Sequence, residues 1–429
     1  MLRGFALLGI LVLNIESFSG PASMHDIPVG VAKPAFVGWH ATLDVCILSV
    51  KWLFFEGKML TLFAILYGAG IVLLTQRFES KGQAGRAADI FHRRNMWLLL
   101  FGLLHGTLIW SGDVLSQYAL VALLVMFPLR HVAAKRLIVA GVAIGIIGGT
   151  FGLTQVTHLA DVLAANRLRH DAVAALAAHR SPTPAQAAAL AADAAARAAE
   201  PTEIRRAVEA GRRPYFESIA PRTTQYLDLV VQLFRTGFIL QIVGSMMLGM
   251  GLFKSGFLTG ASSKSTYVKT ALAGYAITAP VVLIGVTMAH AKDFAVPAVM
   301  VWMVAPYVLQ IFAGALANIA LLLLLSRSGW IEAARGALAN VGRTAFSSYI
   351  LTSLVCQCLF AWGPWKLYGD IEYYQQLYFV VAIWVANLIA SALWLRYFHY
   401  GPLEWVWRSL AYWQRQPLRR DLLRPHDFG

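Results

Sequence analysis

Long apolar runs recur along nearly the whole chain, and no other feature constrains its fold as strongly. Ten runs hold few charged residues, and nine of them approach or exceed the roughly 17 to 25 residues with which a helix crosses about 30 Å of hydrocarbon. Hydrophobic residues make up 58% of the 429 residues and charged residues only 14%, which excludes an ordinary soluble enzyme and a disordered chain. The runs lie at residues 4–19, 58–75, 95–111, 113–129, 136–157, 228–253, 270–289, 296–326, 344–361 and 376–398.

We therefore expect an all-α fold, a polytopic integral membrane bundle of about ten transmembrane helices. The first run has only about 16 residues, which predicts that the native amino terminus is longer than this one. Residues 41–55 are apolar but carry Asp44 and Lys51, so we interpret them as an interfacial or re-entrant helix that leads into the second span. The other expected divisions are N-terminal helices in 1–157, an insertion in 158–227, C-terminal helices in 228–398 and a basic tail in 399–429.

The positions of lysine and arginine predict the orientation, because these residues resist translocation when they lie in short loops. With the amino terminus in the cytoplasm, the cytoplasmic pieces hold twenty basic residues and the short outer loops hold four. This bias accounts for most of the net charge of +14 without any nucleic acid, and leaves membrane lipids as the expected surroundings. We expect the bacterial cytoplasmic (inner) membrane, with both termini cytoplasmic. The four outer basic residues are Lys33, Lys51, Lys292 and Lys366.

The expected insertion, residues 158–227, is polar and alanine-rich. It has 21 alanines among residues 160–210 and nine arginines between 158 and 222. The alanine runs favour helix, and residues 181–184 (Ser-Pro-Thr-Pro) indicate a helix start or a turn between two helices. Long loops cross a membrane largely regardless of their charge, so we place this segment on the outer side. It could be a solvated helical hairpin that acts as a lid or spacer, or a cap that binds substrate.

The densest polarity inside a span falls on the hairpin formed by residues 101–119. His105 precedes Asp113 by eight residues, about 12 Å along a helix, so we expect it below the outer surface at the end of a water-filled funnel. A neutral imidazole can take a proton from a hydroxyl or an amine and return it, so we predict that both residues are catalytic. Alternatively, His105 only bonds to a neighbouring helix and Asp113 only makes a tight turn. We predict that Gln117 and Tyr118 bind substrate.

A second polar cluster lies at the outer mouth of the second span. Glu56 and Lys58 carry opposite charges two residues apart on a broken segment, and His40 lies upstream. We predict a catalytic role for Glu56 and substrate binding for Lys58 and His40, although all three could be interfacial anchors. Asn14 in the first span is polar enough to face the bundle interior, and we include it among the substrate-binding candidates.

Arginines on the inner side could hold the phosphates of a cytosolic donor. Arg343 opens the ninth span, where backbone N–H groups and the helix dipole favour anions. Arg94 and Arg136 flank the same face, and we predict cofactor binding for all three. The alternative is that they only set the topology and contact lipid headgroups. No metal-ligand spacing, P-loop or dinucleotide fingerprint occurs in the sequence, so we expect no metal.

Five stretches, in order over nearly the whole chain, resemble the YeiB-like membrane proteins, a domain-of-unknown-function family. That family is similar, more distantly, to transmembrane acyltransferases such as heparan-alpha-glucosaminide N-acetyltransferase, which pass an acyl group from cytosolic acyl-CoA to a sugar on the far side. Only the alanine-rich insertion lies outside the resemblance. The stretches are residues 2–10, 56–70, 112–119, 342–345 and 401–408.

The resemblance implies an acyl-CoA donor, such as acetyl-CoA, and a glycan or lipid-linked acceptor. The catalytic histidine of those acyltransferases lies shortly before the glycine that begins the span placed here at 58–75. In this chain that neighbourhood is 51–56 and the nearest histidine is His40, so a shared fold is implied more firmly than a shared reaction. We keep two functions, a membrane acyltransferase and a transporter or flippase for a small polar or lipid-linked molecule. No convincing internal repeat is visible, which favours the enzyme. A homodimer is left open.

Overall fold

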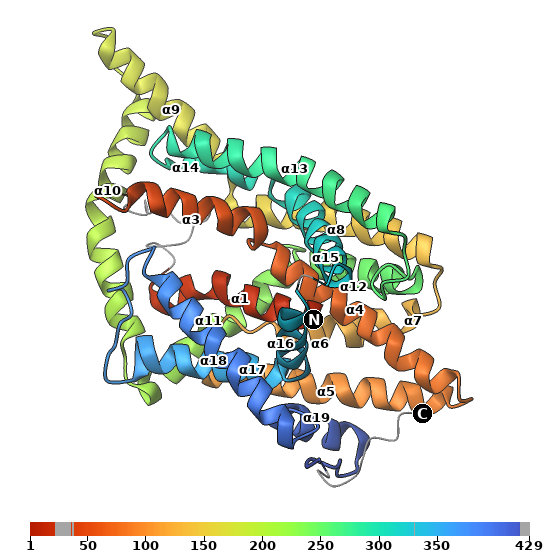
Figure 1. Ribbon diagram of the computed structural model, residues 1–429. Helices are drawn as coiled ribbons and strands as arrows, with labels where there is room; N and C mark the ends of the chain where they lie inside the picture. The colour runs from red at the N-terminus through yellow and green to blue at the C-terminus, as the bar shows by residue number, and fades with distance from the viewer. Residues whose placement is uncertain (22–35, 37, 330, 421–429) are drawn as a thin grey trace.

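The computed structural model describes residues 1–21, 36, 38–329 and 331–420, and it is an all-helical membrane bundle (Figure 1). In this part of the chain, seven helical segments are long and apolar enough to cross a membrane. They are α1 (Leu2–Ser19), α3 with α4 (Ala41–Phe54 and Lys58–Glu79), α8 (Ala134–Thr157), α13 (Lys264–His290), α15 (Tyr307–Arg327), α17 with η3 (Ala345–Gln357 and Cys358–Trp362) and α18 (Gln376–Tyr397).

An eighth span is formed if a bent pair of helices is counted as one. α11 (Tyr215–Arg235) and α12 (Ile239–Lys254) meet at 73° across a break of three residues. Gly237 lies in this break with a φ of +73°, a conformation that costs glycine little and other residues more. The run at 228–253, predicted as one span, is therefore bent at a break, and α11 crosses the predicted boundary at residue 228.

The prediction of a polytopic helical bundle is confirmed, but two of the ten predicted spans do not count as spans among the described residues. The run at 95–111 is the second half of α5 (Ala84–Leu108), whose first half carries charged residues. The run at 113–129 is a helix too short to cross alone, and it includes a stretch of π-helix. That short helix consists of α6 (Leu115–Val121), η1 (Ala122–Met126) and α7 (Phe127–Leu129).

The segment predicted as an interfacial or re-entrant helix is α3, and it leads directly into α4. The two helices form one apolar stretch of 39 residues that is interrupted at residues 55–57, where Gly57 has a φ of +67°. Lys51 lies buried in α3 rather than in an outer loop, and Lys33 falls outside the described residues. Whether α3 spans, re-enters or lies at the interface stays a prediction.

The insertion folds into helices and lies at the left end of the bundle in Figure 1, opposite the loop between α4 and α5. Its helices are α9 (Leu159–Ala177), α10 (Pro184–Gly211) and the start of α11. Thr183 and Gln186 form a reciprocal capping box, so the predicted helix start at 181–184 is correct. Arg212, which follows α10, donates to the carbonyl of Tyr368 at 2.7 Å and pairs with Asp370, so the insertion is docked on the loop before α18.

Short helices complete the bundle. α19 packs along α5, so part of the predicted basic tail is an ordered helix, and residues 421–429 of that tail lie outside the described residues. The remaining elements are α14 (Val296–Val299), η2 (Met300–Val304), α16 (Glu332–Arg343) and α19 (Pro402–Tyr412).

Candidate functional site

The His105–Asp113 pair forms at the tip of the hairpin between α5 and α6. Nδ1 of His105 lies 3.0 Å from a carboxylate oxygen of Asp113, and the side chains are 1% and 0% exposed. Because a carboxylate can only accept, this contact selects the imidazole tautomer with its proton on Nδ1. Nε2 of His105 is buried and has no hydrogen-bond partner in the described part of the chain. The imidazole is therefore oriented on one side and has a free lone pair on the other.

A short relay of hydrogen bonds fixes Asp113 in turn. The backbone N–H of Ser116 donates to the second carboxylate oxygen at 2.8 Å, and the hydroxyl of Tyr226 on α11 donates to Ser116 Oγ at 2.7 Å. Gly102 permits this arrangement, since a Cβ there would lie 2.3 Å from the nitrogen of Ser116 and 2.8 Å from the Asp113 carboxylate. The site thus depends on a close approach of α5 to the start of α6.

The insertion side of this pair is closed by α11, contrary to the expected open funnel. Tyr226 is 1% exposed and packs against Gly106, where a Cβ would lie 2.4 Å from its ring. Arg222 donates to the carbonyl of Leu108 at 2.7 Å. The physical reason is that the insertion returns across the hairpin as an amphipathic helix rather than standing free of the bundle.

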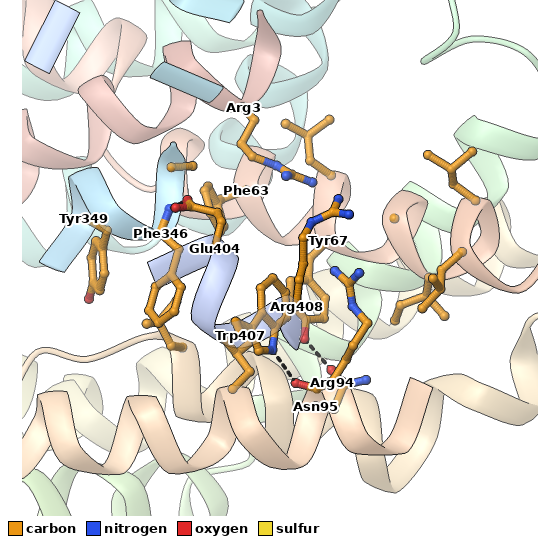
Figure 2. A pocket seen from close by; sticks show the side chains of 18 of the residues that line it. Arg3, Phe63, Tyr67, Arg94, Asn95, Phe346, Tyr349, Glu404, Trp407 and Arg408 are labelled. Atoms are coloured by element: carbon orange, nitrogen blue, oxygen red, sulfur yellow. Dashed lines mark hydrogen bonds between the residues drawn. The ribbon is translucent and has the colours of Figure 1, made fainter. Parts of the chain in front are cut away.

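A cavity of about 330 Å³ lies beside the hairpin (Figure 2). Val114, Leu115 and Tyr349 line it, and the ring centre of Tyr349 lies 4.9 Å from that of His105, which does not itself line the cavity. Four arginines from four helices also line it, which are Arg3, Arg77, Arg94 and Arg408. Figure 2 shows Arg3, Arg94 and Arg408 grouped apart from Tyr349. Among the described residues, Glu404 is the only acidic one in the lining. The cavity therefore joins a cationic part to a part beside Tyr349, whose ring contacts the histidine.

Arg94 is the one predicted cofactor-binding arginine that lines this cavity. Its guanidinium lies 4.4 Å from the ring centre of Trp407 on α19, and the indole N–H of Trp407 donates to the Arg94 carbonyl at 2.8 Å. Figure 2 shows this bond and a second one, in which the Tyr67 hydroxyl donates to the Asn95 side chain. These contacts hold the wall formed by α4, α5 and α19 together.

The anion site predicted at Arg343 is wrong in its geometry. Arg343 ends α16, and its guanidinium donates to the carbonyl of His399 instead of lining the cavity. The first N–H groups of α17 are occupied by a carboxylate of the chain itself, because Glu404 accepts from Phe346 N at 2.6 Å and Ser347 N at 3.2 Å. Burial raises the pKa of the Glu404 carboxyl, while its hydrogen bonds with Ser347 and the backbone oppose that shift.

The other candidates near the hairpin have structural contacts. Gln117 donates to the carbonyl of Asp113 at 3.0 Å, and the Tyr118 hydroxyl donates to the carbonyl of Leu60 at 2.9 Å. Arg136 is exposed at the start of α8 and does not line the cavity. Asn14 is half-buried on α1 and lines a separate small pocket that also includes Tyr349.

Glu56, Lys58 and His40 belong to a second polar centre on α3 and α4, away from the cavity lining. Glu56 accepts from the Tyr307 hydroxyl at 3.2 Å and lies 3.5 Å from the ammonium of Lys51. Lys58 is fully buried. His40 pairs with Asp44 at 2.7 Å.

Among the described residues, no group of three or more histidines, cysteines and carboxylates could hold a metal ion.

The sequence did not predict four of the residues that line the cavity, which are Arg3, Tyr67, Glu404 and Arg408. Two signals could have found them. Arg3 lies in a stretch that carries the family resemblance, and so do Glu404 and Arg408 of α19. The second signal is that α19 has a strongly amphipathic pattern directly after the last span. Neither signal shows that α1 and α19 meet near α5.

Comparison with known proteins gives relatives over nearly the whole length. The model of a family described as "Protein of unknown function (DUF418)" matches residues 252–414. The chain is 30% identical to the uncharacterized protein YeiB of Escherichia coli (strain K12), over 95% of this chain and 94% of that protein. It is 25% identical to the uncharacterized protein YxaH of Bacillus subtilis (strain 168), over 98% and 95%. No solved structure matches the chain.

Proposed function

The chain belongs to the DUF418 family of YeiB-like membrane proteins, and we propose that it is an acyltransferase that uses a cytosolic acyl-CoA. The donor, such as acetyl-CoA, would give its acyl group to a glycan or lipid-linked acceptor from the extracytoplasmic side. The observation that carries this proposal is a cavity lined by four arginines and by Tyr349, whose ring centre lies 4.9 Å from that of His105.

The two ends of the cavity match the two ends of an acyl-CoA. Arginine pairs with phosphate through several charge-assisted hydrogen bonds, so the cationic end suits the phosphates of the donor. The remaining lining is largely apolar and includes Val114, Leu115 and Tyr349, beside which a pantetheine arm with its thioester would be shielded from water. Glu404 is hydrogen-bonded to the start of α17 and interacts with Arg3, but a single carboxylate offsets at most one of the four arginine charges.

The chemistry needs a base at the apolar end. A hydroxyl or amine of the acceptor would attack the thioester carbonyl, so that a C–O or C–N bond forms and the C–S bond breaks. Nε2 of His105 would take the proton of the attacking group and return it to the departing thiolate of CoA. The contact of Asp113 with Nδ1 would orient the ring and stabilise the imidazolium while it carries the proton.

The orientation that goes with this proposal is the one predicted from the basic residues. The four cavity arginines are all among the twenty assigned to the cytoplasm, and Figure 1 shows the insertion helices α9 and α10 at the left, away from α19 and from the loop between α4 and α5. We accordingly place the protein in the bacterial cytoplasmic membrane with both termini inside. The acceptor would reach His105 from the side of α11.

Calorimetric titration of the purified protein with acetyl-CoA tests the donor site. The wild type should bind, and Arg94→Ala should weaken binding by about 10-fold or more, since it removes a charged partner of a phosphate. Arg343→Ala is the matched control, an arginine of the same end that does not line the cavity, and it should leave the affinity unchanged. Absence of binding of any acyl-CoA to the wild type would reject the enzyme and favour the transporter or flippase.

A further inference from the structure

A lysine lies buried at the break between α3 and α4, and it does not line the donor cavity. Lys58 is the first residue of α4 and is 0% exposed, with Gly57 in the left-handed conformation before it. In a membrane-spanning bundle an ionisable group of this kind is costly unless it has partners and a purpose. The groups that bond to the ammonium of Lys58 therefore indicate what this buried charge does.

Three oxygen atoms surround the ammonium of Lys58, and all of them are neutral. It donates to the carbonyl of Trp52 at 2.6 Å, to the carbonyl of Glu56 at 3.2 Å and to the side-chain oxygen of Gln310 on α15. The amide nitrogen of Gln310 is itself buried without a hydrogen-bond partner in the described part of the chain. Carbonyl oxygens at the end of a broken membrane helix, completed by an amide oxygen, are typical ligands of a small cation.

The neighbouring buried lysine has a different environment. Lys51 contacts the carboxylate of Glu16 at 2.5 Å and that of Glu56 at 3.5 Å. Within the described residues, no carboxylate lies within ion-pair distance of the Lys58 ammonium. Loss of a proton from Lys51 would leave the buried carboxylate of Glu16 and the half-buried carboxylate of Glu56 without this ion-pair partner. The charge of Glu56 also acts on Lys58, but loss of a proton from Lys58 would leave Glu56 beside Lys51.

A line of ionisable side chains leads from this break toward the insertion side. Tyr373 interacts with both Lys51 and Glu16, and it adjoins Glu372 in the loop before α18. Glu372 is half exposed and lies 3.1 Å from His40. Among the described residues, Glu56 is the titratable side chain whose charge acts on Lys58. The other titratable groups on α3 and on the segments that pack against α3 and α4 here are Glu16, Lys51, Tyr275, Tyr307 and Tyr373.

We propose that the break between α3 and α4 is a monovalent-cation site and that the ammonium of Lys58 is its resident cation. The site is filled when this amine gains a proton and is empty when the amine loses it. The proton leaves as Lys58 becomes a neutral amine, and it returns from water at the His40 end through the ionisable line. This site is separate from the donor cavity and does not rest on acyl transfer.

Chemical rescue tests the site with small cations as probes. Lys58→Ala should lower the Tm in detergent, and methylammonium or sodium chloride should restore about half of the loss, more than N-methylglucamine chloride does at equal ionic strength. Lys58→Met fills the space with apolar atoms and should not respond. Lys292→Ala, at an exposed lysine, should match the wild type. Equal responses of the Ala and Met variants, or no response to any small cation, would overturn the site.

Substitution of Gln310 tests the charge on Lys58 in a chain that retains the lysine. Gln310→Leu removes one of the three oxygens and should lower the Tm. Gln310→Glu places a carboxylate beside the ammonium and should keep the Tm at or above that of the wild type at neutral pH. If the Glu variant loses as much stability as the Leu variant, Lys58 does not hold a cation in this site and the proposal fails.

Discussion

At the scale of single residues, His105 differs from the other polar groups of its hairpin because half of its hydrogen-bonding capacity is unused. Gln117 and Tyr118 each bond to a backbone carbonyl and so have a structural role in this state. His105 bonds to Asp113 through Nδ1, while Nε2 has no partner among the described residues. A histidine that only bridged helices would be expected to use both nitrogens.

Replacement of His105 separates the catalytic from the structural role. If His105 is the general base, His105→Ala should lower turnover by a factor of about 100 to 10,000 and leave acetyl-CoA affinity nearly unchanged. His105→Gln keeps a hydrogen-bond donor for Asp113 but has no useful pKa, so it should retain the Tm and lose the activity. The measurement is transfer of radiolabelled acetyl groups to membrane acceptors. An active Gln variant would exclude His105 as the base.

The sequence selected His105 and Asp113 as candidates in one hairpin, but it did not predict that they pair, and it missed most of the donor cavity. Helical spacing placed the two residues about 12 Å apart, whereas the turn after α5 brings the carboxylate to 3.0 Å from Nδ1. Arg3 and Arg408 are separated by almost the entire chain, and only the packing of α1 and α19 near α5 brings them together. Arg343 was predicted from a helix end that Glu404 occupies, and local sequence does not show a carboxylate that arrives from 58 residues away.

At the scale of elements, α11 is the part of the insertion that bears on the site. It meets α12 at 73° next to Gly237, and its Tyr226 completes the relay to Asp113 through Ser116. The bend between α11 and α12 could not be predicted from the apolar run at 228–253, because hydrophobic periodicity indicates which face is apolar and not where the chain turns. An acceptor that comes from this side requires α11 to move away from the hairpin.

Tethering α11 to the hairpin should therefore block turnover without affecting the donor. Ser111 and Gln225 are joined by a hydrogen bond of 2.9 Å between their side chains. Cysteines at both positions, with the exposed Cys46 and Cys358 replaced by serine, can be bridged by a short bis-methanethiosulfonate reagent. We expect loss of acetyl transfer, recovery on reduction and unchanged acetyl-CoA binding throughout.

The single Ser111→Cys variant, treated in the same way, is the control for modification alone and should stay active. Full activity of the bridged protein would mean that the acceptor does not pass α11. Loss of donor binding on bridging would instead place α11 in the donor site, which contradicts the proposed division between the two sides.

At the scale of the whole molecule, composition alone predicted the membrane bundle, and the distribution of charge predicted its two unlike ends. The number of spans was predicted less well, because α5 mixes a charged half with an apolar half and residues 115–129 are too short. The described structure agrees with the charge distribution in one respect, since the insertion helices lie opposite the loop between α4 and α5, and α4 carries Arg77 in its last turn before that loop (Figure 1).

Labelling of single cysteines decides which end faces the cytoplasm. Ala195 on α10 and Lys264 at the start of α13 are both exposed, so a cysteine at either position can react with a maleimide that does not cross membranes. In intact spheroplasts with Cys46 and Cys358 replaced, Ala195→Cys should label and Lys264→Cys should label only after permeabilisation. The reason is that twenty basic residues resist translocation on the Lys264 side, whereas the long insertion crosses regardless of its arginines. Labelling of Lys264→Cys alone from outside would invert the topology, turn the arginine cavity away from cytosolic acyl-CoA and remove the donor from the proposed reaction.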